Sequence, residues 1–350
     1  MKSKRIIYLD VLRCLACLAV IMIHTSAGFV VKNFGCKSFW MGNILDSLSR
    51  FAVPIFIMIS GALLLDSKYD YSNKKNIKHI KKLIGFYFFW SLLYSIYSNL
   101  YLPYSLYGSM NYKKFILSII SGPYHLWFIP MLCGLYLILP ILRLWINKKN
   151  KKEIQHFMIL STIFIFFIPQ FIRIVGYYYP DIQSFKLFFN SFNLQFVGGY
   201  TLYFILGWYL NNYDVKRSYV YSLGVIGILF SVIATYLLSI DSNMARYEYD
   251  NLSMNILFYS IMVFVLVKSY CSKKEINKRI LSIVNSISKY SLGIYAIHAL
   301  IIDRLNLYFL DNNIYTAIIV IPVTYIITFV VSYLISIIMS KIKPLKRFVI

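Results

Sequence analysis

The sequence has few charged residues, and very few of those are acidic. Of its 350 residues only 14% are charged, 59% are apolar, and the mean hydropathy is +0.65. Soluble domains usually carry about 25% charged residues. Because apolar runs also repeat along the whole chain, this composition excludes a soluble globular protein. It predicts an all-α, polytopic integral membrane protein.

Cysteines are scarce too: there are five, and four of them lie in or beside apolar runs. They are Cys14, Cys17, Cys36, Cys133 and Cys271. They form no ordered framework, which excludes a disulfide-rich secreted fold. The sequence also contains no H-x-x-x-H or similar ligand cluster, so we predict no metal site. After the apolar runs are assigned, nothing remains for a soluble domain. We therefore expect one transmembrane domain over 1–350, without a fused extracytoplasmic domain.

What the sequence does have is an excess of basic residues. There are 36 Lys and Arg against 13 Asp and Glu, which gives a net charge of +23. The basic residues sit in short clusters between apolar spans, a pattern typical of loops that face the cytoplasm and anionic lipid headgroups. We therefore expect contact with membrane lipid and no binding of nucleic acid.

A spanning helix needs about 20 mostly apolar residues. Ten segments fit, at 6–31, 44–66, 83–103, 125–146, 157–173, 194–211, 219–240, 253–270, 289–310 and 314–340. With the N-terminus inside, 26 Lys and Arg fall in the inner segments and 8 in the outer ones. This asymmetry follows the positive-inside rule and predicts ten helices with both termini cytoplasmic. Residues 104–122 are expected to include a short interfacial helix.

The first predicted span contains ionisable side chains, in the stretch LDVLRCLACLAVIMIHTS. Arg13 and His24 are 11 residues apart, which places them on one helix face about 16 Å apart along the axis. Asp10 lies one turn before Arg13 and can pair with it. A charge near the bilayer centre costs about 2.5–3.5 kcal/mol unless it faces a bundle interior or a cavity. We predict that Arg13 and His24 line a polar path, with His24 near the outer boundary.

Polar residues fall at a similar depth in other predicted spans. Asp46 and Arg50 lie one turn apart where the second span enters, and His298 lies in the ninth. His125 opens the fourth span, two residues before Trp127 of an interfacial aromatic belt. A single histidine in a span is usually a hydrogen-bonded packing residue. Three among so few charged residues suggest one lined cavity, although the sequence alone does not show that they meet.

Four stretches resemble acyltransferase family 3, a family of membrane proteins. RCLACLAVIMIH (13–24) fits its R-x10-H signature, and FAVPIFIMISGALLL (51–65) resembles its second helix. HLWFIPMLCGLYLILPIL (125–142) and SLGIYAIHALI (291–301) resemble its later landmarks. The order of the four is that of the family, and the resemblance covers essentially the whole chain.

The resemblance implies a ten-helix enzyme of a bacterial-type plasma membrane. It implies transfer of an acyl group, usually acetyl from cytoplasmic acetyl-CoA, to a hydroxyl of a carbohydrate or lipid-linked glycan. Acyl-CoA would be a co-substrate, with no bound cofactor. The family's essential residues match Arg13 and His24. We expect His24 to act as general base and Arg13 to neutralise charge on the donor. Direct transfer and a covalent acyl-histidine both remain open.

The candidates for substrate or donor binding are Asp46, Arg50, His125, Trp127, His298, Lys81 and Lys82. The two lysines mark a departure from the family, many of whose members carry an Arg pair before the third helix. Here the region reads KKNIKHIKKLIGFYFFW, with lysines only. Lysine keeps the charge but loses the bidentate fork that suits phosphate. For most of the basic residues topology alone is a sufficient explanation.

Two other functions compete with the enzyme. A transporter or flippase for a polyprenyl-linked saccharide would also use a buried Arg and His along a polar path. A membrane partner in polysaccharide export without chemistry of its own would leave the shared face of Arg13 and His24 unexplained.

Overall fold

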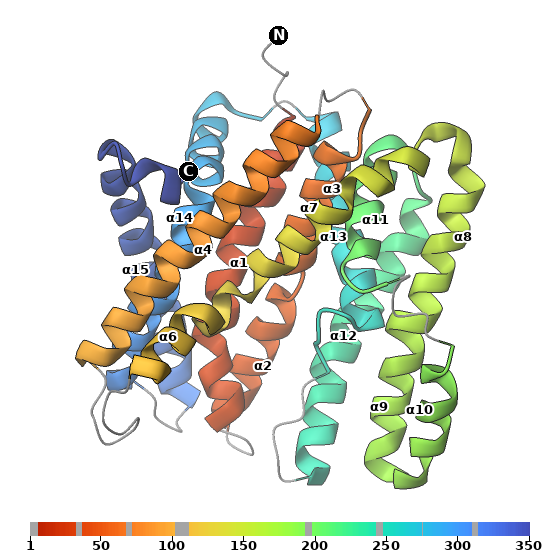
Figure 1. The fold of residues 1–350 in the computed structure, drawn as a ribbon. Coiled ribbons are helices and arrows are strands. Elements are labelled where there is room, and N and C mark those ends of the chain that lie inside the picture. The colour runs from red at the N-terminus through yellow and green to blue at the C-terminus, as the bar shows by residue number, and fades with distance from the viewer. Residues whose placement is uncertain are drawn as a thin grey trace.

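The computed structural model describes residues 6–32, 37–67, 72–101, 112–192, 198–242, 248–274, 276–309 and 314–350. All regular secondary structure within these ranges is helical, which confirms the all-α prediction. The α-helices are α1 (Ile7–Lys32), α2 (Lys37–Ser49), α3 (Ala52–Leu64), α4 (Asn73–Tyr101), α6 (Tyr112–Ser121), α7 (Phe128–Trp145), α8 (Lys151–Ser161), α9 (Ile168–Tyr178), α10 (Gln183–Asn190), α11 (Thr201–Asn212), α12 (Arg217–Ser242), α13 (Met254–Lys273), α14 (Lys278–Phe309) and α15 (Ile314–Lys341). Together they form a bundle (Figure 1).

Eight segments of the described chain are long and apolar enough to cross a membrane. They are Ile7–Val30, Ser38–Leu64, Tyr124–Trp145, Lys148–Tyr178, Arg217–Ile240, Met254–Lys273, Lys278–Leu305 and Thr316–Lys341. The two other predicted spans, 83–103 and 194–211, coincide with α4 and α11. The first turns of α4 are rich in lysine, and α11 has only 12 residues. Residues 102–111 and 193–197, beside these two helices, lie outside the described ranges.

The second predicted span, 44–66, is two helices rather than one. α2 ends at Ser49 and α3 begins at Ala52. The cause is Pro54, which has no N–H to donate to the carbonyl of Arg50 and whose ring crowds that carbonyl. The side chain of Arg50 therefore projects from a break between two helices.

The first helix, α1, agrees with the predicted span 6–31 to within one residue at each end. α1 ends at Lys32, eight residues beyond His24, which corresponds to about 12 Å of helical rise. His24 therefore lies about two turns before the end of α1.

The fifth predicted span, 157–173, is longer in the structure than the sequence predicted. α8 and α9 are joined by a π-helical stretch, η3 (Thr162–Phe167), and the combined segment Lys148–Tyr178 has 31 residues. A π-helical turn contains more residues than an α-helical turn, so it changes which face the following residues present.

α1 stands in the middle of the bundle and packs against α2, α3, α14 and α15. α14 runs alongside it and provides the wall for its polar face. α3 also packs against α11, where glycines permit direct backbone contact. A Cβ on Gly61 would lie 1.7 Å from the carbonyl oxygen of Phe204. A Cβ on Gly207 would lie 1.9 Å from the carbonyl oxygen of Met58. Small residues at such crossings are typical of membrane helices.

Within the predicted interfacial segment 104–122, the structure describes α6. This helix buries none of its side chains and packs on α4. The hydroxyl of Tyr87 on α4 donates to the carbonyl of Ile120 at 2.8 Å, and Ser118 donates to Ser95 at 2.9 Å. An exposed amphipathic helix of this kind fits an interfacial position.

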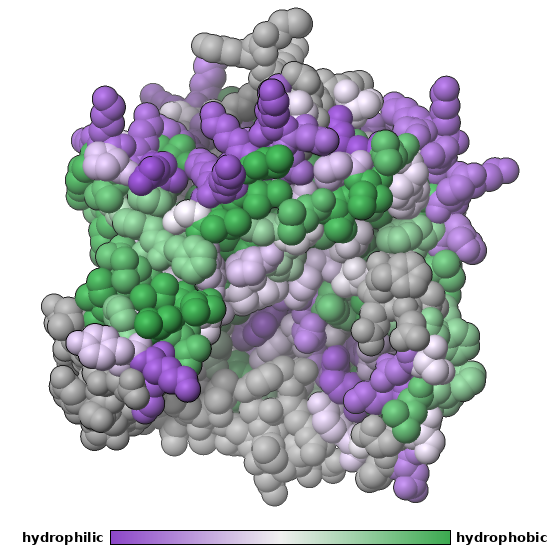
Figure 2. All heavy atoms as spheres, viewed as in Figure 1, coloured by the Kyte–Doolittle hydropathy of each residue, from purple (hydrophilic) through white to green (hydrophobic). Residues whose placement is uncertain are grey.

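We call the end of the bundle where α1 begins the N-terminal face, and the other end the opposite face. Figure 2 shows hydrophilic side chains gathered along the N-terminal face, at the top of the view, above a belt of hydrophobic ones. Nearer the opposite face the surface is hollowed and partly hydrophilic, between the sides occupied by α6 and by α9 and α10 (Figures 1 and 2). Polar groups therefore reach inward from the opposite face.

Candidate active site

Three histidines from three helical segments meet inside the bundle. The ring centroid of His298 on α14 is 5.1 Å from that of His24 on α1. It is 5.2 Å from that of His125, which lies in the 3-10 turn η1 (Tyr124–Trp127) before α7. The sequence left open whether these side chains meet, and the structure brings them together as one cluster.

The three members differ in accessibility. His298 is fully buried, His125 is 2% exposed, and His24 is only half-buried. A ligand entering the cluster therefore meets His24 more readily than the other two rings.

One ring of the cluster has a defined orientation. Nδ1 of His298 lies 2.6 Å from the carbonyl oxygen of Tyr295, one turn earlier on α14. A carbonyl only accepts hydrogen bonds, so this contact places a proton on Nδ1 and leaves Nε2 of the neutral ring as an acceptor. Nε2 is buried and has no hydrogen-bond partner among the described residues. Buried polar atoms are almost always paired, so this acceptor is available to a neighbouring donor.

Tyrosines surround the histidines and hold their backbone in place. The hydroxyl of Tyr295 donates to the carbonyl of His125. Tyr94 on α4 donates to the carbonyl of Ala296 at 2.8 Å, and its ring is 4.9 Å from that of His125. The ring of Tyr124 lies 5.4 Å from both His24 and His125 and reaches the surface.

Arg13 occupies the other end of the polar face of α1. Its Nη1 lies 3.4 Å from Asp10 Oδ1, as the i, i+3 spacing predicted, and donates to Ser288 Oγ at 3.3 Å. Ser288 in turn donates to Asp10 at 2.6 Å. Ser288 and His298 both belong to α14, so Arg13 and His24 face the same neighbouring helix. The prediction that they share a face is confirmed.

A narrow pocket of about 190 Å³ adjoins this face between Arg13 and the histidine cluster. It is bounded by α1, α3, α7 and α14. Arg13 and Val20 line it on α1, and Tyr295 lines it on α14. Most of the remaining lining is apolar, with Phe56 and Phe128 among the side chains. The pocket thus extends from the guanidinium to the tyrosine that orients His298.

Asp46 and Arg50 form a buried ion pair at the break between α2 and α3. Arg50 donates with Nε and Nη2 to the two carboxylate oxygens of Asp46, at 2.5 and 2.7 Å. Its guanidinium also lies over the ring of Tyr249, 4.2 Å from the centroid. Asp46 is 1% exposed and is engaged by Arg50, so its role here is to hold Arg50 in position.

The other candidates lie away from the cluster or beside it. Trp127 is 41% exposed, and its ring is 5.5 Å from that of Tyr200. Lys81 is exposed near the N-terminal face, and Lys82 donates to the carbonyl of Ile350 at 2.6 Å. Nearby, partial burial and the charges of Lys82 and Lys78 lower the pKa of His79, which shows how dense the positive charge is here.

Sequence reasoning missed Tyr94, Tyr124, Tyr295 and Ser288. Two of these could have been found from the sequence. Tyr295 lies one helical turn before His298, and Tyr124 is adjacent to His125. Tyr94 and Ser288 act through contacts between helices that are distant in sequence, and no local pattern indicates them.

A bundle of apolar helices with a pocket between a buried arginine and a histidine cluster defines a multi-pass membrane protein with a polar site in its interior. The chain belongs to the acyltransferase family whose model is described as "Acyltransferase domain", which matches residues 6–338. The family resemblance found in the sequence is thereby confirmed.

Curated relatives come from Staphylococcus aureus. The protein of strain MSSA476 named "Probable poly-beta-1,6-N-acetyl-D-glucosamine export protein" is 23% identical over 313 residues, covering 86% of this chain and 85% of its own. Its counterpart of the same name in strain MRSA252 is 22% identical over the same length. No solved structure matches this chain.

Proposed function

We propose that this protein transfers an acyl group, acetyl in the first instance, from acyl-CoA to a hydroxyl of a cell-surface or lipid-linked carbohydrate, with His24 as general base. One observation carries the proposal: His24 is the accessible member of a histidine cluster next to Tyr295, and Tyr295 lines a pocket that Arg13 also lines. Membership of an acyltransferase family supports the reaction class.

The proposal places the N-terminal face in the cytoplasm of a bacterial-type cell, with ten spans completed by α4 and α11. The orientation is supported by α3, α7, α11, α13 and α15, which all end on the side of the bundle where α1 begins (Figure 1) and are each followed in the sequence by basic residues. Acyl-CoA would then approach Arg13 from the cytoplasm, and the acceptor would approach His24 from outside. Lys81 and Lys82 are on the donor side in this arrangement.

The reaction is an attack of the acceptor hydroxyl on the thioester carbonyl. Neutral His24 removes the hydroxyl proton, the new ester C–O bond forms, and the C–S bond breaks to release the thiolate of coenzyme A. The proton held by His24 then passes to that thiolate. Arg13 offsets negative charge on the donor, and Asp10 and Ser288 keep its guanidinium directed at the pocket.

His298 serves as a positioning residue in this scheme. Its Nδ1–H is used by Tyr295, so Nε2 can accept a hydrogen bond from one N–H of His24. That bond would leave the second nitrogen of His24 with the lone pair needed by a base. The ring separation of 5.1 Å between the two centroids allows the contact.

The test uses purified protein in proteoliposomes with labelled acetyl-CoA and a panel of carbohydrate acceptors. The panel includes β-1,6-linked N-acetylglucosamine oligomers, because the relatives are named for that polymer. We expect His24→Ala to reduce label transfer to the glycan by about 10³-fold, the scale of general-base catalysis. His156→Ala, which removes an exposed histidine from α8, is the matched control. Near-normal transfer by the His24→Ala protein at normal abundance would refute the proposal.

The name of the relatives favours one second candidate, export of a polysaccharide or of its polyprenyl-linked precursor. The same assay separates the two functions. Movement of the saccharide across the membrane without a gain of label indicates transport, whereas label on the saccharide indicates acyl transfer.

A further inference from the structure

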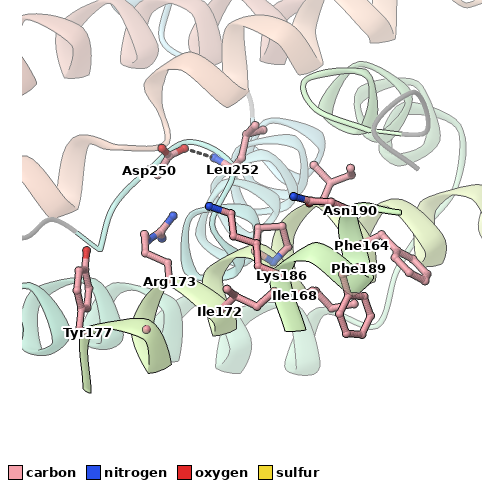
Figure 3. A pocket seen from close by; sticks show the side chains of 13 residues that line it. Phe164, Ile168, Ile172, Arg173, Tyr177, Lys186, Phe189, Asn190, Asp250 and Leu252 are labelled. Atoms are coloured by element: carbon pink, nitrogen blue, oxygen red, sulfur yellow. Dashed lines mark hydrogen bonds between the residues drawn. The ribbon is translucent and has the colours of Figure 1, made fainter. Parts of the chain in front are cut away.

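A cavity apart from the histidines lies between α9, α10 and the segment that joins α12 to α13. Its volume is about 690 Å³, within the usual range for ligand pockets. We call it the outer pocket, and we call residues 248–252 the strap. In Figure 3 the side chains of Arg173, Lys186 and Asn190 point from α9 and α10 toward the strap at Asp250 and Leu252.

The polar groups of the outer pocket are balanced in charge. Arg173 donates with Nε and Nη2 to the buried carboxylate of Glu248, at 3.1 and 2.9 Å, and this leaves Nη1 outside the pair. Lys186 supplies a second cation, and Asp250 supplies an anion whose Oδ1 accepts from the backbone N–H of Leu252 at 2.8 Å. A site for phosphate would require an excess of positive charge. Donors and acceptors without such an excess suit an uncharged molecule rich in hydroxyl or amide groups.

The rest of the lining is apolar and includes aromatic rings. Phe164 and Phe189 lie on one side of the pocket in Figure 3, and Tyr177 lies on the other. Ile168 and Ile172 are placed between them along α9. Sugars combine polar edges with C–H-rich faces, so a lining with few polar groups among flat apolar side chains matches them.

The strap links the outer pocket to Arg50, one of the predicted binding residues, because three successive strap residues face different neighbours. Glu248 binds Arg173 at the pocket, Tyr249 lies under the guanidinium of Arg50, and Asp250 lines the pocket.

A second connection runs through aromatic residues. The hydroxyl of Tyr203 donates to the carbonyl of Asn251 at 2.6 Å. Tyr200, the residue just before α11, is in ring contact with Trp127, which follows His125 by two residues. These contacts connect the strap, through Tyr203 and Tyr200, with the segment that carries His125.

The geometry points to the outer pocket as the acceptor subsite, which holds uncharged sugar units next to the unit that His24 activates. This inference rests on the proposed function for its chemistry and adds the binding site and the preference for an oligomer. An acceptor of several units would occupy the pocket and the cluster together, whereas a single sugar would occupy the cluster alone.

The first experiment measures acyl transfer to β-1,6-linked N-acetylglucosamine acceptors of one to five units. For the unaltered protein kcat/KM should rise with acceptor length. In the double variant Lys186→Ala/Asn190→Ala, the increase in kcat/KM from one to five sugar units should be about tenfold smaller, which is the value of two net hydrogen bonds. The kcat/KM for the single sugar should stay unchanged. Both side chains are exposed, so the double variant should fold. Phe171→Ala, exposed on α9 and outside the pocket, is the matched control.

The second experiment needs no catalysis. It measures the thermal shift that the five-unit acceptor produces in His24→Ala protein, with and without the two α10 substitutions. A ligand that binds the folded state raises Tm, so a shift lost with the α10 substitutions supports the subsite even if no transfer is found. An equal shift in both proteins, or a shift produced by anionic lipid and not by the oligomer, would overturn it.

Discussion

Two helix pairs of the bundle show opposite ways of packing inside a membrane protein. α3 and α11 approach until glycines touch the facing backbone, and their contact is almost wholly apolar. α1 and α14 also lie side by side, yet their interface contains Arg13 with Ser288 and His24 with His298. The first pair is held by close fit, and the second carries chemistry. Tight apolar contacts elsewhere in the bundle hold the helices in place, and this allows a polar interface to exist between α1 and α14.

The largest effect should come from opening the apolar pair. Gly207→Ala places a methyl group 1.9 Å from the carbonyl oxygen of Met58, so α3 and α11 must separate. We expect the free energy of unfolding to fall by about 3 kcal/mol or more, and little folded protein to remain. Detergent-solubilised yield and thermal unfolding measure this effect. Gly134→Ala on α7 is the control, because an added Cβ there meets nothing within 4 Å and should leave stability unchanged or raised. Equal yields would show that the comparison is wrong.

A smaller effect is expected from the polar pair at the histidine end. His298→Leu removes the acceptor that we assign to His24, and kcat should fall about 100-fold with little change in KM. His298→Gln keeps a side chain that both donates and accepts, and it should recover about a tenth of the lost activity. A purely structural role predicts no such rescue at equal protein abundance, so kinetics of the two variants decide between the roles.

The smallest effect is expected at the other end of α1. Arg13→Lys keeps the charge but loses the fork that contacts Asp10 and Ser288, and KM for acyl-CoA should rise about tenfold with kcat nearly unchanged. Arg217→Lys, at an exposed position at the start of α12, is the control. If kcat falls while KM stays constant, Arg13 acts on the reacting carbonyl and does not serve mainly to bind the donor.

The features that could be predicted from sequence are those set by the local period of a helix. The spacing of Arg13 and His24 gave their common face, and the spacing of Asp10 and Arg13 gave their ion pair. The break before α3 also had a visible cause, because Pro54 lacks the N–H that a continuous helix requires.

The meeting of His125 with His298 depends on how α7 and α14 pack, which no local pattern encodes. The same holds for Ser288, whose role exists only because α14 lies beside α1, and for Lys82, whose contact with Ile350 joins positions 268 residues apart.

The wide turn at Thr162–Phe167 decides where the next helix aims its polar side chains. One additional residue in a helical turn rotates everything after it by about 100°. Gln170 and Arg173 follow that turn, and both face inward, to Asn255 and Glu248. Deleting a single residue from the wide turn would restore ordinary winding and swing the Arg173 guanidinium away from its carboxylate. The strap would then lose its anchor to α9, although every contacting side chain would still be present in the chain.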